Sequence, residues 1–122
     1  LPVDRIVVDY NVRRILSGDS APSVQITEHP ISSEGVLLLS PLLDCDDATV
    51  REGVRAYLAD KYEEVEALQL RRGREGWTSF QCADHVLLQQ LSAIDDQLSA
   101  YRDRQLRREV RDAFQEYAYQ WY

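Results

Sequence analysis

The sequence has little cysteine and no long apolar segment. Cys45 and Cys82 are its two cysteines, too few and too far apart for the disulfide framework of a small secreted domain. No window approaches the roughly 18 consecutive apolar residues of a membrane-spanning helix, and the first ten residues lack the basic, apolar and small-residue order of a signal peptide. These absences predict a cytoplasmic protein with no membrane contact.

Positive charge is also scarce. The chain has 14 basic and 21 acidic residues, a net charge of −7 and an isoelectric point near 4.7. A protein whose main task is to neutralise phosphates usually carries a basic face, so the balance disfavours general nucleic-acid binding. The length of 122 residues fits a single domain over 1–122, long enough to bury a core without disulfides or metals.

Motifs for catalysis are missing as well. The sequence contains no glycine-rich phosphate loop, no GxSxG and no HExxH, which are the short patterns that carry phosphate binding, serine hydrolysis and zinc proteolysis. Asp95 and Asp96 are adjacent on an expected helix and point in different directions, so they do not form a general acid and base couple. We predict a protein that is not an enzyme and has no cofactor.

Four side chains are of the types that bind zinc, and they are Cys45, Cys82, His29 and His85. Cys82 and His85 are three residues apart on an expected helix, where two side chains can reach one ion. The spacing of the other two matches no short zinc-finger pattern. Because a buried cysteine acting as a small apolar residue explains Cys82 equally well, we predict no metal site.

The segment LLLSPLLDCDDATV places aspartates directly after an apolar run. Over these few residues it resembles the nucleophile loop of haloacid-dehalogenase-type phosphatases. That resemblance implies a threonine or valine two positions after the second aspartate, where this chain has Ala48, and a later catalytic lysine, whereas the one lysine here lies in an expected helix. Acidic residues at the start of a helix explain the same segment.

The first third of the chain alternates between apolar and polar residues. In RIVVDYNV every second residue is apolar, namely Ile6, Val8, Tyr10 and Val12, which is the period of a half-buried strand. SVQITEH resumes this alternation, and the continuous apolar run VLLLSPLL suits a strand covered on both faces. Short turn clusters separate the three runs. The pattern predicts a three-stranded antiparallel β-meander at about 3–43.

From Asp44 onward the apolar period becomes helical. One stripe at 100° per residue comprises Val50, Val54, Tyr57, Leu58, Val65 and Leu68, as in a helix lying on a core. TVRE at 49–52 is typical of a capping box, and Arg71 and Arg72 suit the negative end of the helix dipole. A second capping box, TSFQ, predicts a helix beginning at Thr78.

That second helix meets no glycine or proline up to Tyr122. Its apolar residues form two lines, one through Leu87, Leu91, Leu98 and Tyr101 and the other through Leu106, Val110, Ala113, Tyr117 and Trp121. The second line is rotated by roughly 120° from the first, so one straight helix cannot lay both on one core. We expect a helical part at about 47–122 that is long or broken near 101–105. The predicted fold class is α+β.

The closing segment EYAYQWY is rich in aromatic residues, and arginines lie opposite the second apolar line. Such a combination is typical of protein contact surfaces. The predicted contact residues are Leu106, Val110, Phe114, Tyr117, Tyr119, Trp121, Tyr122, Arg104, Arg107, Arg108 and Arg111. The sequence therefore favours a non-enzymatic protein-protein interaction domain, such as an adaptor, assembly factor or regulatory subunit. Its partner is another protein or a second copy bound through the C-terminal helix.

The alternative is a small nucleic-acid-binding regulator that uses the arginine face of residues 102–111. The stretch YRDRQLRREVRDAF holds five arginines but also three acidic residues. Its net positive charge is therefore small, and internal salt bridges on a solvated helix account for it. Tyr101 and Phe114 are the rings that such a regulator would stack on bases.

Overall fold

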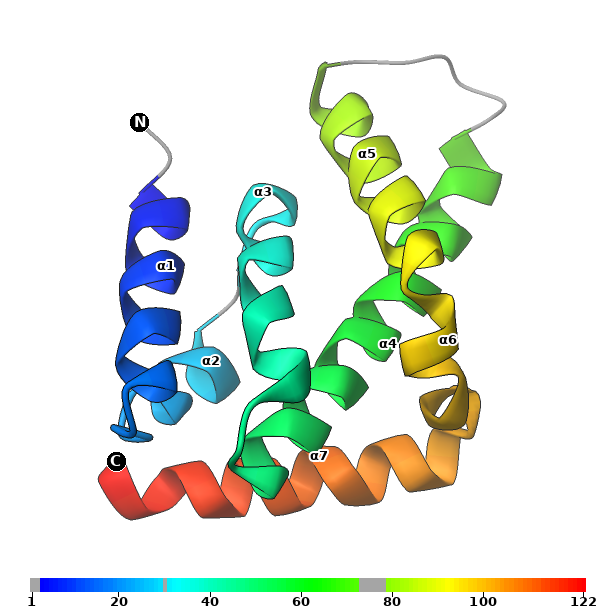
Figure 1. The fold of residues 1–122 in the computed structure, drawn as a ribbon. Coiled ribbons are helices and arrows are strands. Elements are labelled where there is room, and N and C mark those ends of the chain that lie inside the picture. Colours follow the sequence, from blue (N-terminus) through cyan, green and yellow to red (C-terminus); the bar gives the residue numbers. More distant parts are fainter. Residues whose placement is uncertain (1–2, 30, 73–78) are drawn as a thin grey trace.

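The computed structural model describes residues 3–29, 31–72 and 79–122, and the elements it describes are helical (Figure 1). In chain order they are α1 (Val3–Leu16), α2 (Ser23–Glu28), α3 (Ser33–Val36), the 3₁₀ helix η1 (Leu37–Asp44), α4 (Ala48–Arg72), α5 (Ser79–Ala93), α6 (Asp95–Leu98), the 3₁₀ helix η2 (Ser99–Arg102), α7 (Arg104–Ala118) and the 3₁₀ turn η3 (Tyr119–Trp121). Among these residues no helix is long and apolar enough to cross a membrane.

Helix α4 is the centre of the fold. It contacts η1 on one side and α5, α6 and η2 on the other, and α7 packs across it. Figure 1 shows α1, α3 with η1, and the α4–α5 pair standing in a row, while α7 runs beneath them and brings the C-terminus close to the end of α1. The two ends of the described sequence thus contribute to the same side of the molecule.

One apolar core joins these helices. Its fully buried side chains include Leu39, Leu42, Val50, Val54, Leu58, Leu87, Leu91 and Leu98. Burying a side chain of this size stabilises the fold by about 1.5–3 kcal/mol. The α4 stripe predicted from the sequence supplies the middle of this core, and the predicted line through Leu87 and Tyr101 packs on it.

The predicted β-meander is wrong, and with it the α+β fold class, because no strand occurs among the described residues and the fold is all-α. The first run forms α1, which buries Val8, Val12 and Ile15 and leaves Ile6 and Tyr10 exposed. Spacings of four and three residues between the buried side chains are those of a helix face. The alternation at positions 6 to 12 coexists with this pattern, and packing on the core selected the helix.

The two other predicted strands are helical as well. SVQITEH contains α2, and VLLLSPLL forms the end of α3 and η1. A short continuous apolar run does not by itself separate a strand from a buried helix. Pro41 has no N–H to donate to the Leu37 carbonyl, which instead accepts a hydrogen bond of 2.6 Å from Ser40 Oγ. This local replacement lets the helical turn pass through a proline.

The helical half of the chain matches its prediction more closely. Helix α4 ends at Arg72, as expected, but its N-cap is Asp47, whose carboxylate accepts from the Thr49 and Val50 amides at 3.0 and 3.3 Å. Thr49 is therefore not the cap. The predicted break near 101–105 is confirmed, since α7 begins at Arg104 behind the capping carboxylate of Asp103. The predicted cap Thr78 lies outside the described residues.

Candidate protein-contact surface

The middle of α7, which the sequence assigns to a contact surface, belongs largely to the core. Phe114 and Ala118 are buried, and Val110 and Tyr117 are half-buried against the core. Phe114 packs on the backbone of α4 at Gly53, where a side chain would occupy the space of the ring. These residues fasten α7 to its own domain, so they are not free to contact a partner.

The arginines of α7 point toward α4 rather than away from the packed face. Arg107 is buried and donates to Asp60 at 2.5 Å, to Glu63 at 2.9 Å and to the Tyr101 carbonyl at 3.1 Å. Arg104 pairs with Glu63 at 2.9 Å, and Arg111 pairs with Asp60. The prediction that these arginines lie opposite the packed stripe is therefore wrong, because helix α4 offers a matching row of carboxylates.

Burial acts against the charged form of Glu63, but the guanidiniums of Arg107 and Arg104 outweigh it and hold the pKa of Glu63 below its ordinary value. A polar cavity of about 410 Å³ opens beside this row and is lined in part by Arg104, Arg108 and Arg111. Within the described residues Arg108 is the member of the row without an ion pair. The nucleic-acid alternative thus loses most of the free positive charge it requires.

The C-terminal rings are only partly anchored. Tyr117 donates to the Asp47 carboxylate, and the Trp121 ring stands edge-on to the Tyr117 ring with centroids 5.1 Å apart. Tyr119 and Tyr122 form a second edge-on pair at 5.7 Å. Tyr122 is 85% exposed, and about half of Tyr119 and over a third of Trp121 face solvent. These rings remain available to a partner.

Asp47 is the polar anchor for this end of the chain. Besides capping α4 it accepts hydrogen bonds from Ser20 Oγ at 3.2 Å and from the Tyr117 hydroxyl. Burial would raise the pKa of Asp47, but hydrogen bonds, the one from Tyr117 first among them, bring the pKa below its ordinary value. The carboxylate therefore ties the loop after α1, the start of α4 and the end of α7 together.

We expect Tyr117→Phe to lower the free energy of unfolding at neutral pH by about 1.5–3 kcal/mol, the usual contribution of a hydrogen bond to a charged group. Because the pKa of Asp47 is depressed in the folded state, the stability linked to its ionisation is present above about pH 4 and is lost as the pH falls further. Urea unfolding at pH 7 and at pH 3 should show a smaller gap between wild type and variant at pH 3.

Tyr119→Phe is the matched control for that measurement. The Tyr119 hydroxyl lies on the exposed surface, where it accepts from Gln115 at 3.0 Å. Its removal should change the free energy of unfolding by less than about 0.5 kcal/mol. Equal gaps for Tyr117→Phe at the two pH values would contradict the role given to Asp47.

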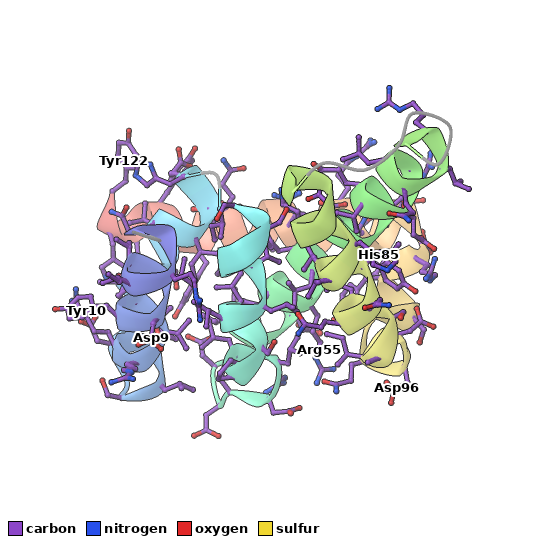
Figure 2. The ribbon with its side chains drawn as sticks, turned by 90° about the horizontal axis from the view of Figure 1, so that it is seen from above. Asp9, Tyr10, Arg55, His85, Asp96 and Tyr122 are labelled. Carbon is purple, nitrogen blue, oxygen red and sulfur yellow. The ribbon has the colours of Figure 1, made fainter. Side chains whose placement is uncertain are left out.

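Exposed apolar side chains gather at the end of the molecule where α1 and the C-terminus lie (Figure 1). We call this the end surface, and its members are Ile6, Val7, Tyr10, Leu16, Tyr119, Trp121 and Tyr122. Ile6 and Tyr10 are each 61% exposed. Figure 2 shows Tyr10 and Tyr122 at this end, with His85 and Asp96 toward the other.

Sequence reasoning missed the α1 half of the end surface. It placed Ile6 and Tyr10 on the buried face of a strand, and the helix leaves both in solvent. The available signal was the helical stripe through Val8, Val12 and Ile15, which puts Ile6 and Tyr10 off the packed face and four residues apart. Next to them a shallow depression of about 510 Å³ is lined by Arg5, Ile6, Asp9, Tyr10, Arg13 and Leu38.

The structure also places the residues considered for chemistry. Among the described residues no group of three or more potential ligands could hold a metal ion, and the side chain of Cys82 lies outside them. Cys45 is a buried free cysteine, and burial raises the pKa of its thiol. Asp44 pairs with Arg55 at 3.2 Å, and Asp47 is a helix cap. Structural roles thus account for the aspartates of the segment that resembles a phosphatase loop.

Comparison of the chain with protein-family models, with curated proteins and with solved structures finds no match in any of the three. No function therefore reaches this chain through a relative. The argument for function has to start from the exposed surface and from the groups on it that lack a partner.

Proposed function

We propose that this chain is a non-enzymatic protein-binding domain, of the adaptor, assembly-factor or regulatory-subunit kind, and that it binds through the end surface. One observation carries the proposal: the exposed large apolar side chains of the described residues are concentrated on α1 and the C-terminal turn. Apolar patches larger than those of ordinary monomers mark interaction sites, and tyrosine and tryptophan are enriched in such contacts. The buried free thiol of Cys45 is in keeping with a cytoplasmic location.

A second copy of the chain is the partner that the surface favours. Arg5, Asp9 and Arg13 recur every four residues along α1 beside Ile6 and Tyr10, and the ion pair of Asp9 with Arg13, at 3.1 Å, is exposed. In an antiparallel pair of α1 helices related by a two-fold axis, Asp9 of each copy can approach an arginine of the other. The apolar residues then meet across the axis, as in an isologous interface.

The measurement that tests this proposal is solution mass by light scattering over a concentration series. We expect wild type to form a dimer, and Ile6→Glu with Tyr10→Glu to raise the dissociation constant at least tenfold, because four added carboxylates would face one another across the interface. The matched control is Leu70→Glu, since Leu70 is 80% exposed on α4 and lies outside the end surface. It should leave the dissociation constant unchanged.

Folding is checked in the same samples by circular dichroism, because Ile6 and Tyr10 are exposed and their replacement should preserve the helices. A wild-type chain that stays monomeric at its highest soluble concentration would refute self-association. A dimer that Ile6→Glu with Tyr10→Glu leaves intact would show that the contact lies elsewhere.

A further inference from the structure

A groove between α1 and α2 adjoins the end surface. Its volume is about 310 Å³, and it is lined by the apolar residues Val7, Val8, Ile26 and Ile31 and by the polar residues Asn11, Gln25 and His29. A mostly apolar wall with a few polar groups is the usual composition of a ligand site, and the volume is at the lower end of the range for such sites.

Asn11 is the unexpected member of this wall. It is only 8% exposed, yet its side-chain amide makes no hydrogen bond to any of the described residues. Leaving a buried donor or acceptor unsatisfied costs about 1–3 kcal/mol. A leucine of nearly the same size would suit the packing of α1 better, because its neighbours Val8 and Val12 are core residues. The cost indicates a partner for the amide that comes from outside the chain.

We propose that the groove binds an extended segment of a partner protein, with one apolar side chain between the α1 and α2 walls and one backbone peptide group paired with Asn11. This inference rests on the proposed function and specifies the partner's chemistry. A carboxamide has a donor and an acceptor, and so does a peptide group, so the two can satisfy each other. A hydrocarbon chain would fill the apolar part but would leave Asn11 unpaired.

Two further features suit a protein segment. Gln25 is an exposed carboxamide at the edge of the same groove, where it can meet a second peptide group of an extended chain. Val7 belongs both to the groove and to the end surface. A partner that covers the end surface therefore reaches the groove without crossing other parts of the molecule.

The test uses N-acetyl-leucine N-methylamide as the probe, titrated into the isotope-labelled full chain and followed by amide chemical shifts. We expect saturable shifts confined to α1 and α2. Asn11→Leu keeps the shape of the wall and removes the amide, so it should weaken probe binding at least tenfold while raising the thermal midpoint of unfolding. A purely structural role for Asn11 would not produce weaker binding together with higher stability.

Two valines of similar exposure provide the control pair. Val7, in the groove, is 46% exposed, and Val86, on α5, is 49% exposed. Val7→Lys should abolish the probe-induced shifts, and Val86→Lys should leave them unchanged. The inference is overturned if the probe causes no saturable shifts, if Asn11→Leu binds it as wild type does, or if octanoate competes with it equally in both proteins, which would identify a hydrocarbon site.

Failure of this inference can be told apart from failure of self-association. A chain that dimerises through the end surface but shows no saturable probe shifts would refute the groove alone. A chain that stays monomeric but binds the probe in an Asn11-dependent way would refute the dimer and leave the groove in place.

Discussion

Gly53→Ala is expected to lower the free energy of unfolding by about 2–3 kcal/mol, the cost of adding a methyl group to a closely packed core. Gly53 lies inside α4, where alanine would ordinarily stabilise the helix by about 1 kcal/mol. Here a Cβ would overlap the Phe114 side chain, which packs directly on the α4 backbone. Helix α7 would have to move away from α4 to accommodate it. Urea unfolding monitored by circular dichroism measures the effect.

A double-mutant cycle isolates that contact. Phe114→Leu removes the ring that a Cβ would meet, so Gly53→Ala should cost much less in its presence, with a coupling energy of about 1 kcal/mol or more. The neighbouring exposed residue on α4 provides the control, since Glu52→Ala should change stability by less than about 0.5 kcal/mol. If Gly53→Ala stabilised the chain, the close packing of α7 on α4 would be wrong.

The comparison of sequence and structure divides at residue 44. Downstream, the long apolar stripe of α4 and the shift of phase before Arg104 were readable, because helices of this length repeat their period several times. Upstream, the runs are short, and one set of residues fits two periods. Val8 and Val12 satisfy both a strand face and a helix face, and Ile15, which decides for the helix, lies beyond the alternating run.

The candidate site was only half accessible to sequence reasoning. The exposed rings of Tyr119, Trp121 and Tyr122 were predicted from their position at the end of an aromatic segment. The burial of Arg107 was not, because it depends on carboxylates of α4 more than forty residues away in sequence. Asn11 gave no signal either, since only the packing of α2 against α1 shows that its amide is enclosed.

The ion pairs of Arg107 should contribute more to stability than any other polar contact of α7. Its side chain is only 9% exposed, and it pairs with two carboxylates, Asp60 and Glu63, which are 30% and 43% exposed. Removing one partner of a fully buried pair costs about 3–5 kcal/mol because the other charge remains buried. Since solvent reaches both carboxylates, we expect Arg107→Met to cost about 2–3 kcal/mol in urea unfolding at pH 7.

Two comparisons separate charge from packing in that result. Arg104→Met removes an ion pair to the same Glu63 from a side chain that is 77% exposed, and it should cost less than about 1 kcal/mol. Adding Asp60→Asn and Glu63→Gln to Arg107→Met removes the uncompensated charges and should restore a large part of the loss. If the triple variant is no more stable than Arg107→Met alone, the arginine acts through the packing of its methylene groups, and the carboxylates of α4 do not decide where α7 lies.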